Sequence, residues 1–247
     1  MFGPEGPSLR ELAVQALSSV EHGYDLLAPK FDHTPFRTPD AVLESVAKAL
    51  AGTGPYQDGL DLCCGTGAGT ETLAGLCRRS VTGVDFSAGM LEVARRRIRP
   101  AGGPGVAWVR GDARALPFTA AFDLVVSFGA FGHFLPGELP VLFRQVHAAL
   151  RPGGRFAFPV LAPPRPTRPA YWALLGFDAV MRVRNALWRP PFVMYYRAFR
   201  LGDVLGGLRR AGFAVETAPQ PEFGRRDDGS PRARLVTARR LSPPPAA

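Results

Sequence analysis

Lysine, cysteine and long apolar runs are all scarce in this sequence of 247 residues. Lysine occurs only at Lys30 and Lys48, so the formal net charge of +9 rests almost entirely on arginine. The three cysteines form no C-x-x-C pair and no cluster with histidine, which argues against a disulfide framework and against a zinc site. The most apolar stretch, Tyr171 to Met181, is too short to span a bilayer and contains Asp178. The N-terminus shows no basic segment followed by an apolar run. We therefore expect a cytoplasmic protein with no metal site and no transmembrane segment.

The overall composition is that of a folded domain. Hydrophobic residues make up 46% and charged residues 21% of the chain, and this length suits a single domain over residues 1–247. The sequence pI of about 10.3 raises the possibility of an acidic partner such as RNA. Arginine is accompanied by abundant Gly, Ala and Pro, however, which also indicates a GC-rich genome. Charge alone does not decide between these explanations.

Two helices are expected in residues 1–54. Ser8 and Glu11 form a capping box before an apolar stripe that runs to Val20. Thr38 as N-cap and Pro39 as a first-turn proline predict a second helix that stops near Gly52.

From Gly59 onward, short apolar runs alternate with helical patterns. The expected strands cover residues 59–64, 80–85, 106–110, 122–127 and 155–160. The expected helices between them end near Cys77, begin at Ser87 and end near Leu150. After a further helix that stops at Gly212, the runs at 213–218 and 234–239 predict an antiparallel hairpin at the sheet edge. The sequence therefore predicts an α/β, doubly wound, Rossmann-like fold with a mostly parallel seven-stranded sheet.

Two segments fall outside this pattern. Residues 161–197 begin rich in proline and continue crowded with aromatic residues and arginine, which indicates an inserted helical cap. Its aromatic residues are expected either to line an apolar pocket or to fill the core of the insertion. Residues 242–247 are expected to be a disordered tail.

The segment GLDLCCGTGAGT, residues 59–70, joins a strand to a helix through a turn rich in glycine. Such a turn lets a ligand approach bare backbone, and Asp85 follows Gly65 by twenty residues, where doubly wound nucleotide-binding folds place an acid against ribose hydroxyls. The pattern also admits an NAD enzyme, but Thr70 stands where G-x-G-x-x-G needs its third glycine. Asp61, just ahead of the turn, suits an ammonium group better than a pyrophosphate. These features favour S-adenosyl-L-methionine (SAM), whose carboxylate can accept from backbone N–H groups at the helix start.

Four motifs resemble those of the class I SAM-dependent methyltransferases, in particular the ubiquinone-biosynthesis-like group. They are LDLCCGTG, VTGVDFSAGMLEVAR, GDARALPF and LRPGGRF, and the resemblance covers about residues 24–160. It implies SAM as cofactor and S-adenosyl-L-homocysteine (SAH) as product. Cys63 departs from the family, which usually has glycine there. The site residues that the resemblance implies are the backbone of Gly65, Thr66 and Gly67 for the methionine part, Asp85 for the ribose, Phe86 and Met90 beside adenine, and Asp112 with Ala113 at the adenine edge.

Each of these residues also has a structural interpretation. Gly65 and Gly67 permit a tight turn, Asp85 and Asp112 suit a cap or a turn, and Met90 suits core packing. In SFGAFGHF, His133 is the one candidate for a general base, and the alternative is a loop histidine that bonds the backbone. Tyr24 and Phe31 are expected either to close over the cofactor or to pack a helix end. The faces of Tyr24 and Phe128 would suit a sulfonium.

The acceptor is expected to be a small, hydrophobic or aromatic molecule bound under the cap. The alternatives are an RNA methyltransferase and a catalytically silent SAM-binding or scaffold protein. Aromatic residues interleaved with arginine would also suit RNA, although no NPPY-type motif follows the fourth strand. If arginines of the cap and of residues 224–234 gather around the opening of the cofactor site, RNA is favoured as the acceptor. An enclosed apolar cavity would favour a small molecule.

Overall fold

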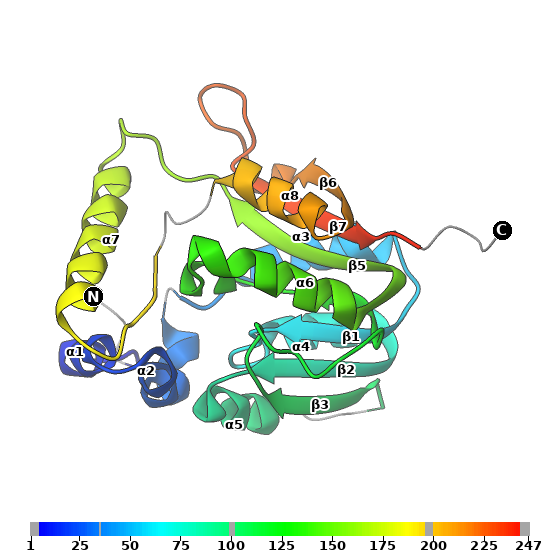
Figure 1. Cartoon of the computed structure of the whole chain (residues 1–247), viewed down its shortest axis with the longest axis horizontal. Helices are drawn as coiled ribbons and strands as arrows, with labels where there is room; N and C mark the ends of the chain where they lie inside the picture. The colour runs from blue at the N-terminus through cyan, green and yellow to red at the C-terminus, as the bar shows by residue number, and fades with distance from the viewer. Residues whose placement is uncertain (1–4, 35, 99–101, 196–199, 243–247) are drawn as a thin grey trace.

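A seven-stranded sheet in the order β3-β2-β1-β4-β5-β7-β6 forms the centre of the molecule (Figure 1). The computed structural model describes residues 5–34, 36–98, 102–195 and 200–242. Strands β1 to β5 are parallel, whereas β7 runs antiparallel to both β5 and β6. The strands are β1 Tyr56–Leu62, β2 Cys77–Asp85, β3 Gly105–Arg110, β4 Phe122–Val126, β5 Leu150–Leu161, β6 Phe213–Pro219 and β7 Ala233–Arg240. The predicted Rossmann-like sheet with an antiparallel edge hairpin is confirmed.

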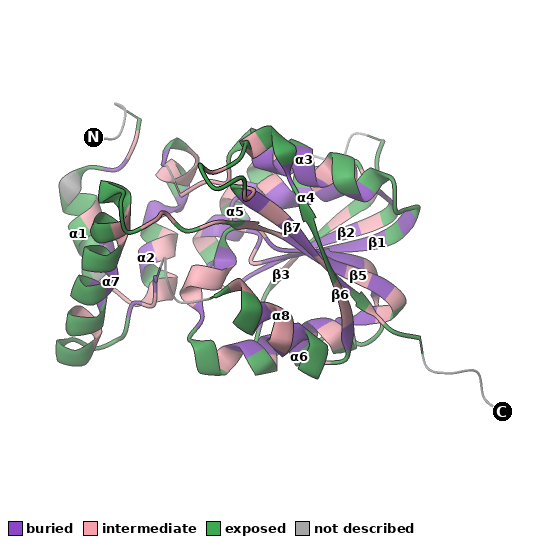
Figure 2. Cartoon of the chain, turned by 90° about the horizontal axis from the view of Figure 1, so that it is seen from above, coloured by how far each residue is buried: buried purple, intermediate pink, exposed green. Residues whose placement is uncertain are grey.

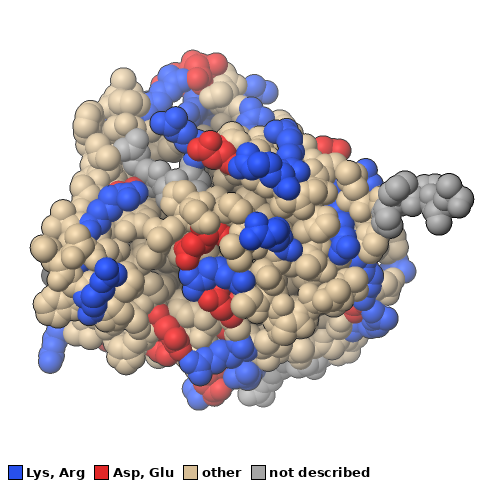
Figure 3. Space-filling view, in the orientation of Figure 1, with Lys and Arg blue, Asp and Glu red and all other residues tan. Residues whose placement is uncertain are grey.

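Helices cover both faces of the sheet, as the view from above shows (Figure 2). Helices α3 and α4 pack on one face around Val46 and Leu73, and α6 and α8 pack on the other around Phe143 and Leu208. The α-helices are α1 Leu9–Leu17, α2 Val20–Leu27, α3 Asp40–Ala51, α4 Ala68–Ala74, α5 Ala88–Arg97, α6 Leu139–Ala149, α7 Pro169–Leu187 and α8 Leu201–Arg210. Short 3₁₀ turns are η1 Ala28–His33, η2 Ala130–His133, η3 Pro136–Glu138 and η4 Pro221–Phe223. Charges of both signs are interspersed over the face in Figure 3.

The N-terminal helices were predicted in kind but not at every boundary. The capping box of Ser8 and Glu11 is confirmed, but the apolar stripe does not run through one helix to Val20. Extended backbone at Ser18 ends α1, and the Ser19 side chain, which accepts from the N–H of His22, starts α2. The expected N-cap at Thr38 is also wrong, because Pro39 holds that position and α3 begins at Asp40.

The helix after the glycine turn is shorter than predicted. It ends at Ala74 with Gly75 as its C-cap, so it does not extend to Cys77. Cys77 instead opens β2 and pairs in register with Tyr56 of β1. An apolar residue after a glycine fits a strand start as well as a helix end, and the pairing partner, distant in sequence, decides which forms.

The region after β5 contains the helix α7, which stands apart from the sheet in both views (Figures 1 and 2). Only Asp178 and Met181 of α7 are buried. The expected cap, residues 161–197, therefore contains a helix, as predicted. Residues 196 and 197 lie outside the described part of the chain. Of the expected disordered tail, residues 243–247 also lie outside it.

Candidate active site

One large cavity, of about 1010 Å³, lies at the carboxyl ends of β1, β2, β4 and β5. The strand order reverses between β1 and β4, and this switch point is where open α/β sheets bind ligands. Most of the predicted site residues line the cavity: Tyr24, Asp61, Gly65, Thr66, Asp85, Phe86, Met90, Asp112, Ala113, Phe128 and His133. Gly67 does not.

Asp85, the last residue of β2, holds the glycine turn in place. Its carboxylate accepts from the N–H of Gly65 at 2.8 Å and from the N–H of Ser87 at 2.9 Å. Ser87, and not Asp85, caps α5, because its side chain accepts from the N–H of Met90. Burial raises the pKa of Asp85 to about 6, although the backbone donors oppose this rise.

Asp61 supplies a second buried carboxylate from β1. It is 1% exposed and accepts from Thr70 Oγ1 at 2.9 Å. Desolvation raises the pKa of Asp61 to about 7, with the charge of Asp85 as a smaller cause. Among the described residues, neither Asp61 nor Asp85 forms an ion pair with a lysine or arginine. Two buried carboxylates without a cation fit the ammonium and ribose hydroxyls of an adenosyl ligand.

The glycines of the turn have different tasks. Gly65 has a φ of +52° and open space where a Cβ would stand, so the cavity reaches its backbone. Gly67 has a φ of +89°, and a Cβ there would lie 2.6 Å from Ile98 Cδ1. Gly67 therefore allows the turn to pack against α5 and is not a wall of the cavity. Thr66 donates its hydroxyl to Asp32 at 2.6 Å, which ties the turn to η1.

Cys63, the departure from the family pattern, adopts a φ of +58°, the left-handed backbone that favours glycine. Its side chain lines the cavity, and burial raises the pKa of the thiol well above its ordinary value. The thiol is therefore neutral. The position accepts a small side chain at the expense of backbone strain.

The expected adenine side of the cavity is formed by the ends of β2 and β3. Met90 is 1% exposed, so it packs in the core and lines the cavity at once. Asp112 accepts from the backbone N–H of Arg114 at 2.8 Å, which is the predicted turn, and from its guanidinium. The guanidinium lowers the pKa of Asp112. The geometry of Met90 and Asp112 therefore fits their structural interpretation, core packing and a turn, and also their expected place beside adenine.

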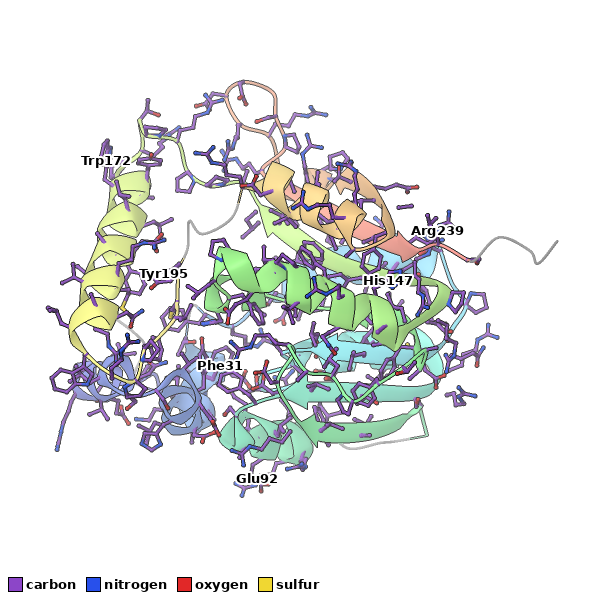
Figure 4. The ribbon with its side chains drawn as sticks, viewed as in Figure 1. Phe31, Glu92, His147, Trp172, Tyr195 and Arg239 are labelled. Carbon is purple, nitrogen blue, oxygen red and sulfur yellow. The ribbon has the colours of Figure 1, made fainter. Side chains whose placement is uncertain are left out.

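The N-terminal segment covers the cavity through contacts that sequence reasoning missed. Asp25 of α2 accepts from Ser87 Oγ at 2.5 Å and from the N–H of Gly89 at 2.8 Å. Asp32 of η1 pairs with Arg97 at 3.1 Å. The signal was present as two acids within the apolar segment YDLLAPKFD, but the partners Ser87, Gly89 and Arg97 lie more than sixty residues away. Figure 4 shows Phe31 of the same segment beside the sheet.

His133 and Tyr24 form a hydrogen-bonded pair in the cavity wall. His133 Nδ1 lies 2.9 Å from the carbonyl oxygen of Val193, which can only accept, so Nδ1 carries the proton. Nε2 therefore accepts from the Tyr24 hydroxyl at 2.8 Å. Burial lowers the pKa of His133, which keeps the imidazole neutral at pH 7. His133 thus bonds the backbone, as the structural interpretation expected, and still faces the cavity through Tyr24.

The other end of the cavity is apolar. Its walls include Phe36, Phe128, Phe131, Phe158, Val160, Leu174, Val193, Met194, Tyr195, Leu201 and Val204. The cap region contributes Leu174 and the stretch around Tyr195, which Figure 4 shows on the chain after α7. Trp172 and Trp188 are 60% and 53% exposed and do not line the cavity. The expectation that the aromatic residues of the cap form a pocket wall or a core is therefore wrong for these two.

The described residues provide neither a metal site nor a helix that could span a membrane. No group of three or more His, Cys, Asp or Glu side chains there has a geometry that could hold a metal ion. No described helix combines the length and apolarity needed to cross a membrane.

Comparison with known proteins defines the class. A methyltransferase domain model matches residues 60–154. The chain is 32% identical to a 2-phytyl-1,4-naphthoquinone methyltransferase of Nostoc punctiforme over 64% of this chain and 72% of that protein. The chain belongs to the class I SAM-dependent methyltransferases.

Other relatives match over shorter parts. A demethylmenaquinone methyltransferase of Lactococcus lactis is 37% identical, over 45% of this chain and 44% of that protein. The chain thus spans about half the length of several relatives that it matches. A SAM-dependent methyltransferase structure from Mesorhizobium loti superposes with a TM-score of 0.55 at 27% identity, covering 80% of this chain and all of that one.

Proposed function

We propose that this protein transfers a methyl group from SAM to a small, hydrophobic or aromatic acceptor. One observation carries the proposal. A single cavity joins two buried carboxylates that lack a cation to an apolar compartment, and its volume of about 1010 Å³ lies at the upper end of the ~300–1000 Å³ range of ligand sites. The relatives named for naphthoquinone and menaquinone precursors, aromatic rings with apolar chains, support this acceptor class.

The proposed cofactor contacts follow from the wall of the cavity. Asp61 would hold the ammonium, the backbone of Gly65 and Thr66 the carboxylate, and Asp85 the ribose hydroxyls. SAM supplies a methyl group on a positively charged sulfur. The faces of Tyr24 and Phe128 would stabilise such a cation. Adenine would lie between Phe86 and Met90, with Asp112 and Ala113 at its edge. Gly67 would act through packing only.

Calorimetric titration with SAM, SAH and NAD tests the cofactor, with Asp85→Ala as the comparison. We expect saturable binding of both adenosyl ligands, loss of that binding in Asp85→Ala, and no binding of NAD. Failure of a folded wild-type protein to bind SAH would refute the proposal. Binding of SAM without turnover of any apolar phenol or quinol in a screen would favour a silent SAM-binding protein.

The Tyr24 and His133 pair provides a route for a proton when the acceptor must lose one. In this route the acceptor proton passes to the Tyr24 oxygen while the Tyr24 proton passes to His133 Nε2. His133 Nδ1 keeps its proton on the carbonyl of Val193 throughout. A base of this kind contributes ~100-fold or more to such reactions. We expect Tyr24→Phe to lower kcat by about that factor with SAH affinity unchanged, and to remove the acid limb of the pH–rate profile. An unchanged profile would contradict the route.

RNA is disfavoured as the acceptor. The two arginines that line the cavity, Arg37 and Arg114, pair with Asp40 and Asp112. In the cap, Arg165 pairs with Asp228 of the loop over residues 224–234. Among the described residues, no arginine other than Arg37 and Arg114 lines the cavity. We place the enzyme in the cytoplasm because Cys63, Cys64 and Cys77 are all unpaired thiols.

A further inference from the structure

The outer side of α7 is an apolar surface that no described residue covers. Trp172, Val180, Val183 and Leu187 follow one another at helical spacing along it and are 60%, 66%, 59% and 80% exposed. Trp188, 53% exposed, directly follows the helix, so a tryptophan stands near each end of the stripe. Figure 2 shows that most of α7 is exposed, and Figure 4 shows Trp172 at the end away from α1. We call this stripe the α7 outer face. Exposed patches of this kind mark binding surfaces.

The charges on and around the α7 outer face are mostly positive, and at its Trp172 end Arg165 and Arg168 pair with the exposed Asp228 and Asp227. The ionisable residues of the segment 165–190 are five arginines and one acid, Asp178, and Asp178 is 5% exposed on the inner side of the helix. Arg182 and Arg189 are exposed, and the guanidinium carbon of Arg182 lies 4.6 Å from the centroid of the Tyr195 ring. Arg184 donates to the carbonyl of Ser18 and fixes α7 to the end of α1. Helix α1 lies beside this end of α7 in both views (Figures 1 and 2).

This chemistry matches a particular occupant. The face has tryptophans at both ends, an aliphatic stripe between them, and the exposed Arg182 and Arg189, neither of which pairs with a described acid. These are the features of a helix that lies in an anionic lipid–water interface. A second copy of the chain fits less well, because a two-fold contact between two such faces would set arginines against arginines. We propose that the α7 outer face binds the surface of an anionic lipid bilayer.

The inner side of the same segment is a wall of the proposed acceptor compartment. Leu174 of α7 lines the cavity, as do Val193 and Tyr195 after it. Asn185 holds these parts together, since its amide donates to Tyr195 Oη at 2.9 Å and accepts from the N–H of Phe192 at 2.8 Å. Docking would therefore set the apolar end of the cavity beside the bilayer, from which an apolar acceptor enters. This entry of the acceptor from the bilayer rests on the proposed function, whereas the docking itself does not.

Flotation of the full chain with lipid vesicles tests the proposal. The probes are phosphatidylcholine vesicles with and without phosphatidylglycerol, at low and at high salt. We expect wild type to float with the phosphatidylglycerol vesicles at low salt and to bind phosphatidylcholine alone weakly. The double variant Val180→Asp with Val183→Asp should lose about tenfold or more, since burying one such side chain is worth at least that factor. Arg189→Gln should lose about fivefold.

The controls separate docking from folding and from cofactor binding. Leu241→Asp changes another exposed apolar side chain, 51% exposed, which follows β7 at the opposite end of the molecule (Figure 1). This variant should float as wild type does. The unfolding midpoint and SAH affinity of the double variant should match wild type, because both valines are outside the cavity. If the wild-type protein does not bind SAH, that result contradicts the proposed function and leaves the docking proposal intact.

Three results would overturn the proposal. The first is equal binding to both kinds of vesicle, or to neither. The second is a wild-type dimer that the double variant converts to a monomer in light scattering, with no vesicle binding, which would make the face a contact between copies. The third is salt-sensitive binding of single-stranded RNA, lost in the double variant, without vesicle binding.

Discussion

Replacing Asp61 by asparagine keeps the shape of the side chain and removes its charge, which tests the electrostatics of the cofactor end of the cavity. The pKa of Asp61 is raised to about 7 in the fold, chiefly by burial, against 3.8 in the unfolded chain. The folded state therefore binds the proton more tightly than the unfolded state. Asp61 lowers the stability of the unliganded protein progressively as pH rises from about 4 to about 7, and the loss persists above that window.

The two pKa values give the size of the effect. Their difference corresponds to ~4 kcal/mol at about pH 8, part of which relaxation of the site recovers. The asparagine oxygen still accepts from Thr70 Oγ1. We therefore expect Asp61→Asn to raise the free energy of unfolding by about 2 to 4 kcal/mol at about pH 8 and by less than ~1 kcal/mol at about pH 4. SAH should bind about 10- to 100-fold more weakly, since a charge-assisted hydrogen bond is lost.

Urea unfolding at both pH values and calorimetry with SAH measure the two effects. Asp58→Asn, on the same strand, is the matched control. Arg79 and Arg151 hold Asp58, and the hydrogen bond from Arg79 is the largest cause of its lowered pKa. Its contribution is therefore present above about pH 4 and is lost at lower pH, so Asp58→Asn should destabilise the protein at about pH 8. An Asp61→Asn protein no more stable than wild type at this pH would refute the argument from desolvation. An unchanged SAH affinity would refute the ammonium contact.

The glycine turn yields three further predictions. Gly67→Ala should lower the free energy of unfolding by ~3 kcal/mol in urea titration, because its methyl group meets α5 and its φ is positive. Gly65→Ala should cost only ~1 kcal/mol for its backbone, yet weaken SAH binding in calorimetry, because its methyl group enters the cavity. Equal stability losses in these two variants would contradict the assignment of Gly67 to packing and of Gly65 to the cavity wall. Thr66→Val should lower stability by ~1 kcal/mol and reduce the amide-exchange protection of η1, since the bond to Asp32 is lost; unchanged protection would show that this bond does not hold η1.

The sequence predicted those parts of the molecule that depend on neighbours along the chain. The strand and helix alternation, the glycine turn and Asp85 twenty residues later all lie within short segments, and they define a parallel sheet with a ligand site at its switch point. The cavity then gathers residues from separate motifs, such as Asp61 and Asp112, because parallel strands end at one edge of the sheet.

Contacts between distant segments were not predictable in this way. The hydrogen bond between Tyr24 and His133 joins residues 109 positions apart. Because the lone pair of His133 Nε2 accepts from the Tyr24 hydroxyl, the candidate base faces the cavity through Tyr24. The same holds for Asp25 and Asp32, which the sequence shows only as acids in an apolar segment. Long-range partners depend on packing, which local patterns do not encode.

Asp178 has different implications for membrane binding in the sequence and in the structure. In the sequence it counts against a membrane role, because it interrupts the most apolar stretch of the chain. In the structure it is 5% exposed, so it adds no exposed negative charge to the apolar residues and arginines of α7. The net charge of +9 likewise says little by itself, since Arg79, Arg97 and Arg114 are paired with acids elsewhere on the fold. The direction in which one acid points therefore decides whether the arginines of α7 border a surface suited to anionic lipid.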